Sequence, residues 1–171
     1  MLVEIVLMQK FILFLGYPTR ALSVTLFSLL LSSGIGSYAS SLFGRGKIAR
    51  TILYGCGLIV ILVSIYNVFL PQVLASLLQL EATQRAIITF ALIFPLGFLM
   101  GMPFPNGLRI LGEESNREVP WMWAINGGFS VFGAVIATAI GIMWGLNYAL
   151  FLGATAYFVA LLCGRNAGKS G

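Results

Sequence analysis

Histidine is absent from this chain, and its two cysteines, Cys56 and Cys163, both stand inside apolar stretches. Without histidine, the chain cannot build a triad in which an imidazole activates a nucleophile, or a metal site that depends on imidazole ligands. Two isolated cysteines also lack the paired spacing of a zinc site or a redox-active dithiol. We therefore predict no catalytic, cofactor-binding or metal-binding residue, and we interpret both thiols as small apolar groups in helix packing seams.

Charge is scarce as well. Charged residues make up 9% of the 171 residues, hydrophobic residues make up 59%, and the mean hydropathy is +0.98. Because soluble domains carry about a quarter charged residues, this composition predicts a protein embedded in the lipid bilayer. The formal net charge is +5, but the basic residues stand at the ends of apolar runs rather than in a patch with aromatics. We therefore expect no nucleic-acid partner.

Runs of mainly apolar residues predict the helices. Residues 2–15 would rise only about 21 Å, so they predict a short helix or the end of a longer one. Residues 71–80, which begin with Pro71, are interpreted as a short interfacial helix. The expected fold is all-α, a polytopic membrane bundle of about six helices with one or two broken or kinked. The membrane helices are predicted at 2–15, 21–44, 51–70, from 86 with a kink at Pro95 to the prolines at 103 and 105, and twice within 119–164 with a turn at 145–147.

The basic residues predict the topology. Positive residues collect on the cytoplasmic side of a membrane, which places Arg45, Lys47 and Arg50, the 109–118 loop, and Arg165 with Lys169 on one side. With six spans, both termini would then face the cytoplasm of a bacterial inner membrane. Residues 1–164 are predicted to form one transmembrane domain, and residues 165–171 a basic cytoplasmic tail.

Three polar residues interrupt the first apolar run: Glu4, Gln9 and Lys10. Ionisable groups within a span are costly and often functional. In a structural reading, Glu4 reaches the headgroups from the start of the chain and Lys10 extends its aliphatic stem toward them. In a functional reading, Lys10 or Gln9 faces the interior of the bundle.

The first candidate site is the stretch that contains Pro103, Pro105, Asn106 and Arg109. Two prolines two residues apart remove two backbone donors, so regular helix is expected to stop here. Freed carbonyls at membrane depth must face protein or water, as in the broken helices of transporters. The alternative is a helix end at the interface, with Arg109 anchored to headgroups.

The second candidate is Asn126, which lies about one turn inside the fifth predicted helix and is followed by Gly127, Gly128 and Ser130. An amide at that depth needs a hydrogen-bond partner, and flanking glycines let another backbone approach. We predict that this amide pairs with the 103–107 break. Small residues at four-residue spacing, Ser28, Ser32, Gly36 and Ser40, and the pair Gly97 and Gly101 similarly predict close helix packing.

Several motifs together resemble the C-terminal transmembrane region of bacterial membrane-bound spermidine-synthase-like proteins. In that family, membrane helices flank a cytosolic domain of the aminopropyltransferase or methyltransferase type. The resemblance implies a cytosolic partner domain but transfers no catalytic residue, because nothing in this chain matches the soluble domain. The motifs that carry it are Glu4, Gln9-Lys10-Phe11, Phe14-Leu15-Gly16-Tyr17-Pro18-Thr19, Leu26-Phe27-Ser28-Leu29-Leu30, Gly34-Ile35-Gly36-Ser37, Met102-Pro103-Phe104-Pro105-Asn106-Gly107-Leu108-Arg109 and Pro120-Trp121-Met122-Trp123-Ala124-Ile125-Asn126-Gly127.

Two classes of function follow from the sequence. The first is a noncatalytic membrane subunit or anchor, whose partner is a synthase-like soluble domain or a larger membrane complex. The alternative is part of a transporter for a small, cationic solute that passes the broken-helix region. Enzymatic activity of this chain alone is not expected.

Overall fold

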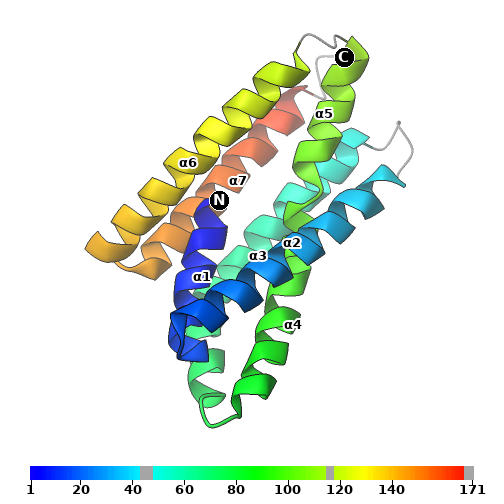
Figure 1. Ribbon diagram of the computed structural model, residues 1–171. Coiled ribbons are helices and arrows are strands. Elements are labelled where there is room, and N and C mark those ends of the chain that lie inside the picture. Colours follow the sequence, from blue (N-terminus) through cyan, green and yellow to red (C-terminus); the bar gives the residue numbers. More distant parts are fainter. Residues whose placement is uncertain (43–47, 115–117, 168–171) are drawn as a thin grey trace.

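The computed structural model describes residues 1–42, 48–114 and 118–167. Seven helices cover these ranges, and Figure 1 shows them packed together as a bundle. The expected all-α membrane bundle is confirmed. The helices are α1 (Leu2–Leu15), α2 (Pro18–Ser41), α3 (Ile48–Ser76), α4 (Ala82–Met100), α5 (Pro103–Glu114), α6 (Val119–Met143) and α7 (Leu146–Ala167).

Five stretches within the described ranges are long and apolar enough to cross a bilayer, which defines the chain as a membrane protein. Helices α4 and α5 together supply one of them, and α1 is too short to be counted. The turn between α6 and α7 lies at Trp144 and Gly145, where Gly145 adopts φ +102°, close to the predicted turn. The five stretches are Pro18–Ser41, Arg50–Ser76, Ala82–Ile110, Val119–Met143 and Leu146–Arg165.

Helix α1 lies inside the bundle and contacts five of the other helices. Apart from Glu4, Gln9 and Lys10 its residues are apolar, which is typical of a largely buried helix. Val6, Leu7 and Phe11 are fully buried. Its first turn packs against the middle of α6 and α7, because a Cβ placed on Gly133 or Gly153 would meet Leu2 or Val3. Helix α1 therefore covers only half the length of the helices around it.

Helices α2 and α4 form the closest helix pair, here called the α2–α4 seam. A Cβ on Gly36 would lie 2.0 Å from the Phe98 carbonyl oxygen, and one on Gly101 would lie 2.1 Å from that of Ser33. The predicted packing by small residues is thus confirmed. The buried serines donate along their own helix, as Ser32 does to the Ser28 carbonyl at 2.6 Å, rather than across the seam. A hydroxyl bonded in this way needs no partner from the neighbouring helix.

Proline does not end α3. The helix continues through Pro71 to Ser76, so the predicted helix end at Pro71 and the separate interfacial helix over 71–80 are wrong. Proline is tolerated in a membrane helix when neighbouring groups satisfy the freed backbone. Pro95 is likewise accommodated inside α4. There the Tyr66 hydroxyl donates to the Leu92 carbonyl, close to the carbonyl that Pro95 leaves without its helical donor.

Three described arginines lie at one end of the bundle, whereas Arg20 and Arg85 lie at the other. Arg50 and Arg165 line one groove between α3 and α7, and Arg109 reaches the end of α2. Arg165 lies in the last turn of α7, so helix extends into the region predicted as a tail. Residues Arg45, Lys47, Arg117 and Lys169, which belong to the same topology prediction, lie outside the described ranges.

Candidate functional site

The predicted break between α4 and α5 is only two residues long. Gly101 and Met102 leave the helical path, and α5 begins at once with Pro103. The expected stretch of irregular backbone over 103–107 is therefore wrong. Pro103 and Pro105 occupy the first and third positions of α5, where a backbone N–H has no partner within the helix in any case. Two prolines can thus start a helix as readily as they stop one.

The Asn106 side chain is buried at the α4–α5 junction and forms a hydrogen bond there. Its side chain is 1% exposed, and its Nδ2 donates to the Met102 carbonyl at 3.0 Å. The Asn106 backbone N–H reaches the same carbonyl oxygen at 3.4 Å. The freed carbonyl is therefore satisfied by the chain itself rather than offered to a solute. The Asn106 Oδ1 is buried and has no hydrogen-bond partner within the described ranges.

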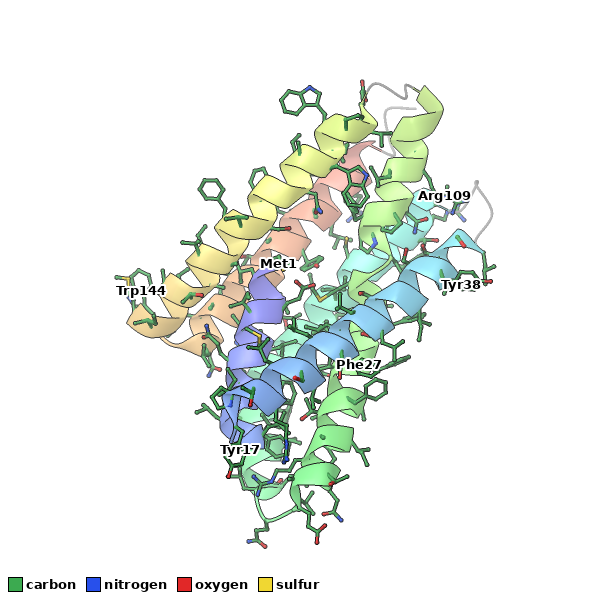
Figure 2. All side chains as sticks on the ribbon, viewed as in Figure 1. Met1, Tyr17, Phe27, Tyr38, Arg109 and Trp144 are labelled. Carbon is green, nitrogen blue, oxygen red and sulfur yellow. The ribbon has the colours of Figure 1, made fainter. Side chains whose placement is uncertain are left out.

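Arg109 lies two turns into α5, and its side chain points to the C-terminal end of α2 (Figure 2). Its Nη1 donates to the Ser40 carbonyl at 3.4 Å. Carbonyls in the last turn of a helix lack helical donors, and a cation is favourable there. The arginine thus ties α5 to α2, an interaction that neither reading of the sequence anticipated.

Asn126 does not join the junction. Its side chain is exposed on α6, and Ser130 is half-buried. No hydrogen bond reaches the Asn126 amide from the residues that the structure describes. The contact between α5 and α6 is made instead by two aromatic rings, Phe104 and Trp123, in a T-shaped arrangement with centroids 5.1 Å apart. The expected pairing of the amide with the break is therefore not formed.

Glu4 and Gln9 make local contacts. A Glu4 carboxylate oxygen lies 3.0 Å from the terminal ammonium of Met1. The Gln9 Oε1 packs over Gly141 of α6, where an added Cβ would come within 3.3 Å of it. Glu4 therefore pairs within the first turn of the chain, whereas Gln9 lies at the contact between α1 and α6.

Lys10 faces the bundle interior, as the functional reading requires. It is 8% exposed, and its Nζ donates to the Asn147 Oδ1 at 2.6 Å. The two residues are 137 positions apart in the sequence, so α1 and the first turn of α7 meet here. Lys10 and Asn147 line a cavity of about 370 Å³ whose other walls are apolar side chains of α1, α3 and α7 and of the turn after α3.

Arg85 is a residue that the sequence analysis missed. Its Nε donates to the Leu80 carbonyl at 2.8 Å, its Nη1 to the Phe14 carbonyl at 3.1 Å, and its Nη2 to the Leu78 carbonyl. One guanidinium therefore caps α1 and fixes the α3–α4 turn. Only its place as the one cation in the first turn of α4 signals such a role.

Replacing Arg85 by methionine is expected to lower the free energy of unfolding by about 2 kcal/mol, because three carbonyls lose a charged donor. Thermal unfolding in detergent measures this loss. Arg20→Met is the matched control, since Arg20 is exposed at the same end and contacts only the Tyr17 ring among the described residues. Equal melting temperatures for the two variants would contradict the capping role.

A metal site is not assembled in the described ranges. No three cysteine or acidic side chains lie close enough there to hold a metal ion. Cys56 is buried in α3, whereas Cys163 is exposed on α7, so the predicted packing role fits Cys56 alone. The geometry defines a membrane helix bundle whose polar side chains mostly bind its own backbone.

Comparisons of the chain with family models, with curated proteins and with solved structures find no match. The resemblance to spermidine-synthase-like membrane regions therefore stays a prediction.

Proposed function

We propose that this chain is a noncatalytic membrane subunit that binds a transmembrane helix of a partner along the uncovered half of α6. The observation that carries the proposal is a packing face of α6 that α1 covers at one end only. Asn126, Ser130, Gly133 and Ala137 follow one another at spacings of four, three and four, which places them on one face of α6.

The covered end of this face packs against another helix of the chain. Gly133 packs against the first turn of α1, and Ala137 is fully buried. Toward the start of α6 the same face continues with the exposed Asn126 and the half-buried Ser130, which the described helices leave uncovered. We call this uncovered continuation the α6 slot. Small residues at helical spacing are the usual contact surface of membrane helices, so a second helix suits the α6 slot.

A hollow next to the start of α1 supports this reading. It has a volume of about 540 Å³ and is lined by residues of α1, α4, α6 and α7, among them Met1, Met100, Gly133 and Tyr157. Since four helices contribute, the hollow lies between helices rather than on one outer surface. It adjoins the α6 slot at Gly133.

The Asn126 amide adds a polar reason for a partner. An amide in contact with lipid chains lacks hydrogen bonds, and interhelical bonds of this kind contribute about 1 kcal/mol. Asn126 has no such bond within the described part of the chain. A partner helix in the α6 slot would supply one.

The family resemblance and the charges extend the proposal. The partner is a synthase-like protein or a larger complex in a bacterial inner membrane. The end of the bundle that carries Arg50, Arg109 and Arg165 faces the cytoplasm, where positive residues are retained. A soluble domain of the partner would then lie on that side.

Recovery of the partner from native membranes tests the proposal. Tagged wild-type chain is expected to bring down a stoichiometric membrane partner. Ser130→Leu fills the α6 slot and is expected to reduce the recovery at least about fivefold, because overpacking costs about 1–3 kcal/mol. Gly128→Leu is the control, since a Cβ added at Gly128 lies in open space.

Two results would count against the proposal. One is equal recovery with Ser130→Leu and Gly128→Leu. The other is a homo-oligomer without a partner that moves a cationic solute across liposome membranes, which would favour the transporter alternative.

A further inference from the structure

We infer that the cavity at Lys10 binds an anionic amphiphile, with the charged headgroup on Lys10 and Asn147 and the apolar part along α1 and α3. This inference is independent of the proposed subunit function, because the cavity lies away from the α6 slot. It rests first on the burial and the hydrogen bonding of the Lys10 ammonium. Lys10 is more than nine-tenths buried, yet the only acceptor that the described chain offers it is the neutral Asn147 oxygen.

The available hydrogen-bond donors specify the charge of the ligand. An ammonium has three donors and Lys10 uses one, so two remain. Because the ammonium can only donate, the Asn147 oxygen faces it and the Asn147 NH₂ group keeps its own two donors. Leu146 and Asn147 also begin α7, and N–H groups in a first helical turn have no acceptor within the helix. All these groups favour an anion.

No lining residue within the described ranges competes for the ammonium, because none is acidic. An unpaired buried charge is strongly unfavourable, whereas a charge-paired one is stable. A carboxylate or phosphate group placed between Lys10 and the start of α7 would provide the missing counter-charge.

The other lining residues of the cavity favour an apolar group on the ligand. They consist of apolar side chains, among them Leu13, Phe14, Leu74 and Leu78. Leu13 is 76% exposed, so the cavity opens sideways toward the bilayer rather than being closed. Asn147 is in the first turn of α7 and Leu78 follows the end of α3, which puts the polar end at the level of lipid headgroups. A volume of about 370 Å³ suits one short chain, at the small end of ligand cavities.

Dodecanoate is the probe for a free amphiphile, with dodecanol as the uncharged probe of equal length. In a neutral maltoside detergent, dodecanoate is expected to raise the Tm of the wild type in a concentration-dependent way, and dodecanol is not. Lys10→Met is expected to weaken dodecanoate binding about tenfold or more, the loss of one charged hydrogen bond. Lys10→Arg keeps the charge and is expected to bind.

Arg20→Met is the matched control, because it removes one positive charge from the same end of the chain outside the cavity. Its affinity for dodecanoate is expected to stay within about twofold of the wild type, as exposed charges contribute little. Asn147→Asp is the second variant, in case Lys10→Met does not fold. It pairs Lys10 internally and repels an anion, so it is expected to abolish binding while the fold is kept.

Bilayer lipid is the other source of the same chemistry. Protein reconstituted in vesicles of phosphatidylcholine and phosphatidylglycerol is analysed by native mass spectrometry. Retention of phosphatidylglycerol by wild type and by Arg20→Met, but not by Asn147→Asp, identifies a lipid as the ligand. Stabilisation by dodecanoate without such retention identifies a free amphiphile. The inference is overturned if dodecanol stabilises as well as dodecanoate, or if the Lys10→Met and Asn147→Asp proteins bind both anions like the wild type.

Discussion

Replacing Gly36 by alanine is expected to reduce the free energy of unfolding by about 3 kcal/mol, the upper end of overpacking effects. The new Cβ would lie 2.0 Å from the Phe98 carbonyl oxygen and 2.8 Å from its carbon. Both are backbone atoms of α4, so no side chain can turn aside and the two helices must separate. Unfolding in mixed micelles, followed by circular dichroism, measures the loss.

Gly34→Ala is the control for this prediction. Gly34 lies two residues earlier on the same helix, is exposed, and has open space around its Cβ position. Alanine is favoured over glycine in a helix by about 1 kcal/mol, so this variant is expected to be as stable as the wild type or more so. If Gly36→Ala matched Gly34→Ala, the α2–α4 seam would not have the close approach described.

The second large effect is expected from Asn106→Asp. The change is nearly isosteric, but it removes the donor to the Met102 carbonyl and places a carboxylate in a site that is 1% exposed. The Asn106 Oδ1 receives no hydrogen bond from the described residues. A buried charge without a partner costs about 3–5 kcal/mol, and we expect the same range here. The melting temperature and the yield of folded protein in detergent are the measurements.

Asn106→Leu tests whether the loss of stability comes from the buried charge or from the loss of the amide. Leucine also loses the bond to Met102, but it removes the unpaired Oδ1 at the same time. Because replacing a partly satisfied polar group by an apolar one is inexpensive, a loss of about 1 kcal/mol is expected. Similar losses for the aspartate and leucine variants would show that the site is open to water.

Charge spacing predicted most of the helices, because lipid excludes ionised groups and the uncharged runs must be spans. The turn near Gly145 was located in this way, because the uncharged run over 119–164 requires two spans, whereas the short helix over 2–15 followed from its apolar residues despite Glu4 and Lys10. Prolines were harder to interpret, since the same residue can end a helix, start one or lie inside one. Pro71 lies inside α3, whereas Pro103 starts α5. Which of these occurs depends on neighbouring helices that a sequence does not place.

Long-range polar contacts could not be predicted. Lys10 meets Asn147 across 137 positions, and Arg85 meets Phe14 across 71. The sequence showed that Lys10 needed a partner but gave no means to choose one. Asn126 was predicted to be paired because its depth requires it, yet the residue that lies against α5 is Trp123, one turn earlier. Side-chain partners follow from the rotation of each helix about its axis, and the hydrophobic pattern of an almost uniformly apolar helix does not define that rotation.

The T-shaped contact between Phe104 and Trp123 gives the α4–α5 junction an intrinsic fluorophore. The indole of Trp123 touches the second residue of α5, while Trp121 is 70% exposed nearby and Trp144 lies at the other end of α6 (Figure 2). With Trp121 and Trp144 replaced by phenylalanine, the emission of the remaining indole would report directly on any swing of α5 relative to α6, without an attached dye.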